Sequence, residues 1–368
     1  MPGPTRSSAT WWPSGCWACH AREARAELLM DFAFNEQQLE FRHQLRALTE
    51  KQCTPADVRL AWQSELGWSP ARWKALGDLG VTGMTVPVDH GGLGLGMVDL
   101  ALLLEEAGRA ALPEPLAETA AVAVPLLARV PVRAASLAER WMAAAAAGEA
   151  TLSVADPGLP TMVTAGAQLA VVFHGVAIHA VEAPKAVSIR RSVDGARTLW
   201  DVGPEEPPAS TAVVRGEPAA ELWHAACDNG AWAASAVLLG VADRLIDMTS
   251  AYAKQRVQFG KAIGSFQAVK HHLADALIRL EFARPLVYRA AWSLDESDPE
   301  ASRHVSMAKS AASDAADLAA RVGLQVHGAI GYTWEHDLHL WMKKAWALGG
   351  AWGDAGWHRA RLLGLVDW

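Results

Sequence analysis

The hydrophobic pattern of this chain changes period twice, and this limits the possible fold more than any other feature of the sequence. Apolar residues recur at helical spacing over residues 30–149, give way to short strand-like runs over 150–220, and return to helical spacing over 221–368. Helices that flank a small β segment define an α+β fold that is mainly α. We therefore expect an N-terminal helical domain, a small middle β domain and a C-terminal four-helix bundle.

The N-terminal segment shows start and stop signals for helices. Asn35 occupies an N-cap position, and Phe41, Leu45 and Leu48 follow on one helical face. Gly80 is placed to end a later helix. The glycine-rich loop after Gly80 lacks the lysine of a phosphate-binding P-loop, so the sequence predicts no nucleotide site of that kind.

Apolar stripes also predict the helices of the C-terminal segment. The first two stripes run over residues 237–252 and 269–280. An alanine-rich third helix is expected over 307–325, and a fourth over 335–361. Pro285 is expected to kink or interrupt the second of these helices, because proline removes a backbone hydrogen bond.

Composition excludes several classes of protein. The net charge of −7 lacks the basic excess of a nucleic-acid binder. No unbroken apolar run reaches about 18 residues, so we expect no membrane span. Four cysteines are too few for a disulfide framework in a chain of 368 residues, which favours a reducing, cytoplasmic location. His336 and His339 are not accompanied by a further ligand set, so no metal site is expected.

Residues 1–29 show neither a helical nor a strand period, and Met30 opens the first well-patterned segment. We expect residues 1–29 to be a non-native extension ahead of the true start, or to be disordered. This segment contains Cys16 and Cys19 followed by His20, which is the spacing of a c-type haem attachment site. No export signal and no second axial ligand accompany that spacing, so haem is a minor alternative.

Two long motifs carry a resemblance to a known family. Residues 252–267 read YAKQRVQFGKAIGSFQ, and residues 325–336 read QVHGAIGYTWEH. Both resemble hallmark segments of the acyl-CoA dehydrogenases, at the separation which that family requires. Residues 87–94, PVDHGGLG, resemble the family's N-terminal glycine loop. The resemblance therefore extends over residues 30–368. Within the family, the chain resembles the short subunits of bacterial heteromeric enzymes of the steroid-degradation type.

The resemblance implies FAD as the cofactor and assigns residues to it. In the family, an arginine, a phenylalanine and a helix-borne glutamine reach the flavin of the neighbouring subunit. The corresponding residues here are Arg256, Phe259 and Gln267, joined by Gln325 and Gly328 of the second motif. This chemistry is reasonable, because a guanidinium offers bidentate contacts to a pyrophosphate and a glycine allows close approach.

The catalytic base of the family is missing from its two known positions. The reaction is α,β-desaturation of an acyl-CoA thioester, in which a carboxylate removes the α-proton and the flavin takes the β-hydride. Ungapped alignment places Trp352 at one base position and Gly230 at the other. The catalytic residue is therefore unknown from the sequence, and the weak candidates are Asp228, Asp354 and Glu335, for which surface or capping roles are the simpler expectation.

Three interpretations remain open. The first is a subunit of a heteromeric acyl-CoA dehydrogenase, a heterotetramer in which a partner supplies the glutamate. The second is a self-sufficient homo-oligomer with an unusual base, and the third is a non-catalytic scaffold. The resemblance also implies an electron-transferring flavoprotein as the electron acceptor. The family's flavin-facing strand is reduced to residues 155–158, ADPG, which leaves fewer backbone donors for the flavin ring.

Overall fold

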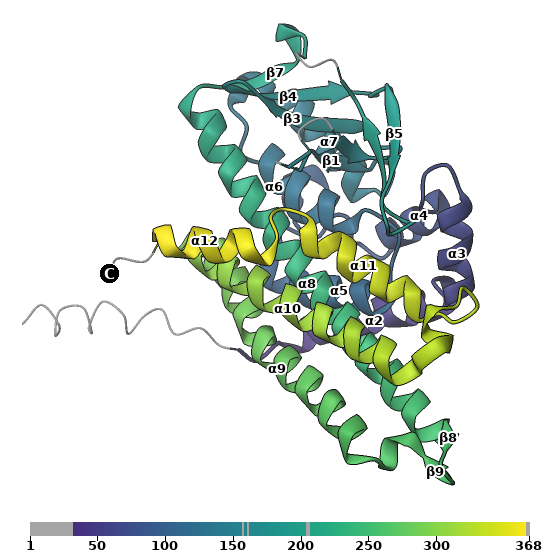
Figure 1. Cartoon of the computed structure of the whole chain (residues 1–368). Coiled ribbons are helices and arrows are strands. Elements are labelled where there is room, and N and C mark those ends of the chain that lie inside the picture. Colours follow the sequence, from purple (N-terminus) through teal and green to yellow (C-terminus); the bar gives the residue numbers. More distant parts are fainter. Residues whose placement is uncertain (1–31, 157, 160–161, 204–206, 366–368) are drawn as a thin grey trace, which may run out of the picture. The chain divides into compact units, whose positions relative to one another are not determined.

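The computed structural model describes residues 32–156, 158–159, 162–203 and 207–365 (Figure 1). The chain forms one compact unit from Asn35 onward, and the fold given below is the fold of that unit. Residues 32–34 belong to a separate preceding unit. The expectations for residues 1–29, including the spacing of Cys16, Cys19 and His20, lie outside the described residues.

Helices make up the N-terminal region, and side-chain caps start three of them. Asn35, Thr54 and Ser69 each accept a hydrogen bond from the backbone at the start of a helix, so the N-cap predicted at Asn35 is confirmed. Gly80 follows Leu79, the C-cap of the third helix, and has a φ of +81°. The helical elements are α2 (Glu36–Gln52), α3 (Pro55–Gln63), α4 (Pro70–Asp78), η1 (Val88–His90), α5 (Met97–Arg109), the π-helix η2 (Ala117–Ala123), α6 (Val124–Leu127), η3 (Val132–Ala134) and α7 (Ala135–Ala146).

The middle region contains two small sheets. In the first sheet the strand order is β1-β3-β4-β7, with β1 parallel to β3 and the other pairs antiparallel. In the second the order is β2-β6-β5, and all pairs are antiparallel. The strands are β1 (Leu152–Val154), β2 (Met162–Thr164), β3 (Leu169–His174), β4 (Ala177–Glu182), β5 (Ser188–Arg191), β6 (Thr198–Asp201) and β7 (Ala212–Arg215), with η4 (Ala209–Thr211) before the last.

Long helices form the C-terminal region, and they lie side by side in Figure 1. The helix α8 packs against α9, α10 and α11, and α10 packs against α9, α11 and α12. The elements are α8 (Glu217–Gln255), β8 (Val257–Gln258), β9 (Lys261–Ala262), η5 (Ile263–Ser265), α9 (Gln267–Asp295), α10 (Ala301–His327), η6 (Gly328–Tyr332), α11 (Leu338–Gly350) and α12 (Ala355–Leu365). The expected fold, with helices around a small β region, is confirmed.

Two details of the bundle differ from the sequence-based expectation. The helix α9 continues through Pro285 without interruption. Buried Ala283 and Val287 pack the helix on either side of this proline, and such packing offsets its missing hydrogen bond. The fourth helix predicted over 335–361 is two helices, because Trp352 and Gly353 adopt positive φ values of +58° and +91° between α11 and α12.

The helix α8 is long and apolar enough to cross a membrane by length and composition. However, 89% of its most apolar window is buried inside the structure. The apolar character of α8 is therefore explained by its place in the core of the bundle, where Trp232, Leu238 and Leu239 are fully enclosed.

The helices α5 and α8 cross in backbone contact. A Cβ atom added at Gly240 would lie 1.7 Å from the carbonyl oxygen of Glu105, and one added at Gly108 would lie 1.9 Å from that of Val237. Only glycine permits this approach at both positions. The crossing joins the N-terminal helices to the bundle and fixes where α8 lies.

Candidate functional site

The five residues expected to bind the flavin lie at one end of the C-terminal bundle, which we call the open end. Arg256 directly follows α8, Phe259 lies in the turn between β8 and β9, and Gln267 begins α9. Gln325 lies in the last turn of α10, and Gly328 caps that helix. The β8–β9 hairpin marks this end in Figure 1.

An aromatic contact joins the two motifs at the open end. Tyr252 of α8 stacks on His327 of α10, with ring centroids 4.3 Å apart and an interplanar angle of 22°. His336, which follows η6, meets both rings edge-on. The side chains of α8 therefore hold the end of α10, and the two motifs of the sequence form one surface.

The open end fits an anionic ligand from outside the chain. The side chain of Arg256 is exposed and makes no ion pair or hydrogen bond with any described residue. Phe259 is 91% exposed and has a φ of +54°. A Cβ added at Gly328 would meet nothing within 4 Å, and the φ of this glycine is +64°. A free guanidinium beside an uncovered backbone is a suitable cradle for a pyrophosphate.

The two positions at which the resemblance places the family's base meet in the structure, far from the open end. Gly230 lies 26 residues before Arg256 on α8, which is about 39 Å along the helix axis. A Cβ added at Gly230 would lie 2.3 Å from the indole of Trp352. The indole is only 7% exposed, and it lies against the glycine where a base would otherwise project. We call this place the Trp352 site.

Two side chains hold the backbone of Trp352 in its left-handed conformation. The backbone N–H of Trp352 donates to Asp156 Oδ2 at 2.7 Å, and its carbonyl oxygen lies 3.0 Å from His358 Nε2. Asp156 belongs to the shortened strand segment, and His358 lies on α12. These bonds offset the cost of a positive φ at a non-glycine residue, so the indole is fixed in place.

A buried lysine holds the end of α11 just before Trp352. Lys309 of α10 is fully buried, and its ammonium donates to the carbonyl oxygens of Leu348 and Gly349, each at 3.0 Å. Its third contact is to Ser313 Oγ at 3.2 Å. Burial lowers the pKa of Lys309 to about 7, because desolvation penalises the charged form.

None of the three candidate bases faces the Trp352 site as a free carboxylate. Asp228 is buried, pairs with Arg361 and accepts from Ser302 Oγ at 2.6 Å. Asp354 is exposed and accepts from the backbone N–H of Trp357 at 2.7 Å, which is a capping role on α12.

Glu335 lies at the opposite end of α11. It is exposed in the turn before this 13-residue helix, which separates it from Trp352 by about 20 Å. The geometry therefore gives Asp354 a capping role and Glu335 a surface position. Asp228 takes part in a structural ion pair with Arg361.

A cavity of about 730 Å³ adjoins the Trp352 site. Of the imidazole and carboxylate groups in its lining, Asp156 bonds to Trp352 and both nitrogens of His358 have partners, whereas the exposed His224 makes no hydrogen bond with a described residue. Burial lowers the pKa of His358 to about 4, so the ring is neutral at pH 7. The lining includes four large aromatic side chains, those of Phe173, Trp223, Trp352 and Trp357.

The sequence alone did not indicate Lys309 or His358. Their polar side chains are buried by tertiary packing, and no local motif marks them. Within the described ranges, no group of three or more histidine, cysteine or acidic side chains could hold a metal ion.

Comparison with family models decides the affiliation. The model "Acyl-CoA dehydrogenase, N-terminal domain" matches residues 35–149, and "Acyl-CoA dehydrogenase, C-terminal domain" matches residues 222–361. Together they cover more than half of the chain. The chain belongs to the acyl-CoA dehydrogenase family. It is thus a member of a family of oxidoreductases that act on acyl-CoA with FAD as the cofactor, as the two motifs predicted.

Curated relatives of similar sequence are acyl-CoA dehydrogenases of mycobacteria. The chain is 32% identical over 314 residues to acyl-CoA dehydrogenase IpdE2 of Mycolicibacterium smegmatis, which covers 83% of this chain and 90% of that protein. It is 34% identical over 310 residues to acyl-CoA dehydrogenase FadE34 of Mycobacterium tuberculosis, covering 82% of this chain and 42% of that one.

Solved structures of complexes share the fold. A chain of the ChsE4-ChsE5 complex from Mycobacterium tuberculosis superposes with a TM-score of 0.81 at 25% identity, covering 92% of this chain and 100% of the other. A chain from a variant of the Tcur3481-Tcur3483 steroid acyl-CoA dehydrogenase gives 0.79 at 25% identity, covering 90% and 97%. The acyl-CoA dehydrogenase fold of this chain is therefore shown by sequence and by structure.

Proposed function

We propose that this chain is the base-free subunit of a heteromeric acyl-CoA dehydrogenase, in which a partner subunit supplies the catalytic glutamate. The observation that carries this proposal is the contact between Gly230 and Trp352. Both family positions for the base meet in one volume, and an indole fills it. None of the three candidate bases, Asp228, Asp354 and Glu335, reaches that volume as a free carboxylate.

In this proposal the residues of the open end bind FAD. When it is bound, FAD supplies the hydride acceptor. Arg256 neutralises the pyrophosphate, Gly328 leaves its backbone open to close approach, and Phe259 covers the ligand with its exposed ring. Since these residues lie about 39 Å along α8 from this chain's own Trp352 site, they serve a flavin that reacts at the partner's site.

The partner's carboxylate then removes the α-proton of the substrate, while this chain holds and orients the flavin from across the interface. We infer that the substrate is an acyl-CoA derived from a steroid, because one similar complex is named a steroid acyl-CoA dehydrogenase. An electron-transferring flavoprotein in the cytoplasm is the electron acceptor that fits this chemistry. Support for a second subunit comes from the two complexes with the same fold.

The two alternative interpretations predict different outcomes. A self-sufficient homo-oligomer needs a base, and its best candidate, Asp228, is engaged by Arg361 and Ser302. A scaffold without flavin has no use for the unpaired Arg256. Both alternatives are therefore outcomes of the following test rather than separate proposals.

The test compares the chain alone with the chain co-purified with a family member that carries the glutamate. We expect no flavin bleaching by acyl-CoA from the chain alone and bleaching by the complex. Replacing the partner's glutamate by glutamine is expected to lower turnover by about 10²–10⁴-fold, the typical contribution of a positioned base. Turnover by the chain alone that disappears in Asp228→Asn would establish the self-sufficient enzyme, and a colourless complex would establish the scaffold.

A further inference from the structure

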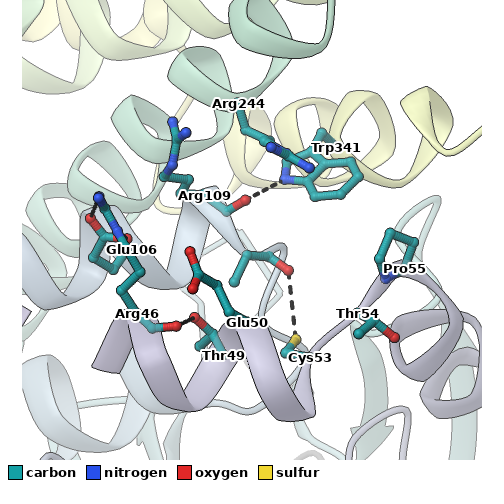
Figure 2. A pocket seen from close by; sticks show the side chains of 11 residues that line it. Arg46, Thr49, Glu50, Cys53, Thr54, Pro55, Glu106, Arg109, Arg244 and Trp341 are labelled. Atoms are coloured by element: carbon teal, nitrogen blue, oxygen red, sulfur yellow. Dashed lines mark hydrogen bonds and ion pairs between the residues drawn. The ribbon is translucent and has the colours of Figure 1, made fainter. Parts of the chain in front are cut away.

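A second cavity lies apart from the open end and the Trp352 site. Its volume is about 310 Å³, and it is bounded by the C-terminal ends of α2 and α5 and by α8 and α11 (Figure 2). Nothing in the proposed reaction uses it. The charged side chains that line it are Arg46, Glu50, Glu106, Arg109 and Arg244.

Two of the three arginines in this cavity have carboxylate partners. Arg46 Nε donates to Glu106 Oε2 at 3.0 Å, and the pair joins α2 to α5. Arg109 bridges from α5 to Asp243 and Asp247 on α8. These ion pairs fix the walls of the cavity. The third arginine, Arg244, is not part of either pair.

Arg244 is a half-buried cation without a partner among the described residues. Its side chain makes no ion pair or hydrogen bond with them, and its guanidinium carbon lies 5.4 Å from the centroid of the Trp341 ring. Figure 2 shows the guanidinium lying along this indole, with no dashed line from it. The indole N–H itself donates to the carbonyl oxygen of Arg109 at 2.9 Å. The ring, 3% exposed, is a fixed platform that holds the guanidinium at the cavity.

The acidic groups that act on Arg244 are all engaged elsewhere. Asp243 and Asp247 bind Arg109, and Asp337 binds Arg59. Burial lowers the pKa of Arg244, and the positive charge of Arg109 lowers it further. An oxyanion in the cavity would relieve both effects, because it would replace the lost hydration and separate the two cations.

The remaining walls are compatible with an anion. Thr54 and Pro55 are the N-cap and first residue of α3, so the positive end of this helix adjoins the cavity. Burial raises the pKa of the Cys53 thiol to about 12, so it carries no negative charge at pH 7. Two carboxylates of the lining oppose an anion: Glu106, which is paired with Arg46, and Glu50, which is exposed and has no ion pair with a described residue.

We propose that this cavity binds a phosphate group carried by a small molecule, with Arg244 as the main ligand and Arg109 beside it. A guanidinium held against an indole has N–H groups available for bidentate contacts to a tetrahedral oxyanion. The volume admits a small phosphate ester. The site is separate from the flavin-binding residues, so it does not depend on the proposed function.

The test is calorimetric titration of the full-length chain, as purified, with inorganic phosphate. We expect saturable binding by the unmodified chain. Because a hydrogen bond to a charged group contributes about 1.5–3 kcal/mol, Arg244→Gln is expected to weaken binding by at least about tenfold. Arg244→Lys keeps the positive charge but loses the bidentate N–H geometry of the guanidinium, so its phosphate affinity is expected to lie between those of the unmodified chain and Arg244→Gln. Glu50→Gln removes one opposing charge and is expected to tighten binding.

Two control variants make the result specific. Arg129→Gln changes an exposed arginine that has no ion pair with a described residue, and it is expected to leave phosphate binding unchanged. Arg256→Gln changes the open end, and any phosphate bound there would be lost in that variant instead. The proposal is overturned if the unmodified chain gives no saturable heat, or if Arg244→Gln binds as well as the unmodified chain while its circular dichroism spectrum is unchanged.

Discussion

The helix α8 connects two regions that contrast in every physical respect. At the open end, Arg256 has no partner among the described side chains and Phe259 is 91% exposed. At the Trp352 site, Trp352 is 7% exposed and its indole packs on Gly230. The backbone N–H and the carbonyl oxygen of Trp352 both have hydrogen-bond partners. Under the proposed function, this contrast means that one chain keeps the surface that binds a cofactor for a neighbour and loses the volume in which chemistry takes place.

The largest expected effect comes from adding one methyl group to the closed region. Gly230→Ala would place a Cβ 2.3 Å from the Trp352 ring, and overpacking of this kind costs about 1–3 kcal/mol of unfolding free energy. Helix propensity alone would favour alanine by about 1 kcal/mol, so the sign of the change reports the clash. Urea denaturation gives the measurement.

A double-mutant cycle and a matched glycine complete this test. In a Trp352→Ala background, Gly230→Ala is expected to be neutral or stabilising, since the ring is gone. Gly349→Ala, in α11, meets nothing within 4 Å and is expected not to destabilise the chain. Equal destabilisation by Gly230→Ala with and without the indole would show that the two positions do not compete for space.

At the open end, the expected effect is on ligand binding and not on folding. Arg256→Ala removes an exposed, unpaired charge, so the unfolding free energy is expected to change by less than about 0.5 kcal/mol. Loss of charge-assisted contacts to the pyrophosphate is expected to lower FAD affinity by about tenfold or more. Flavin absorbance of the assembled complex measures this. Full occupancy in the variant would contradict the assigned role, and Arg129→Ala, which changes an exposed arginine without an ion pair to a described residue, serves as the control.

The buried lysine predicts a pH dependence that belongs to the closed region. Burial lowers the pKa of Lys309 from 10.5 to about 7, so the unfolded chain binds more protons between these values. Stability from this group is therefore expected to rise with pH above about 7, by up to about 1.4 kcal/mol per pH unit. The difference between the unmodified chain and Lys309→Met isolates this slope from other titrations. Parallel curves for the two proteins between pH 7 and 8.5 would show that the lysine does not titrate there.

The smallest effect is expected from the N-terminal extension. Residues 1–29 bring no periodic apolar face that a core could bury. Their deletion is expected to leave solubility and Tm unchanged, and a scanning calorimetry comparison checks this. A loss of several degrees would show that the extension takes part in folding.

The sequence predicted most of the fold because its signals are local. Hydrophobic period, caps such as Asn35, and the two long motifs depend on neighbouring residues along the chain, and each led to the right element. The interruption expected at Pro285 was wrong, because packing on both sides of the proline keeps α9 continuous. The break at Trp352 was not predicted, because hydrogen bonds with Asp156 and His358 hold it. These partners come from other elements, and no spacing rule marks them.

The candidate site was predictable only as a list of positions. Alignment with the family identified Gly230 and Trp352 as the places where a base should stand. That one residue fills the space left by the other is a fact of three-dimensional packing. The sequence likewise could not predict that Arg244 is available to bind a ligand, because this depends on which acidic side chains already pair with other arginines.

Under the proposed function, the packing of Trp352 on Gly230 would also make the loss of a base difficult to reverse during evolution. A glutamate regained at Gly230 would collide with the indole. A glutamate regained at Trp352 would leave the volume of an indole empty and bury a carboxylate against a bare helix backbone. Each single step back passes through a less stable protein, so under the proposed function a lineage that has adopted this pair would depend on its partner subunit from then on.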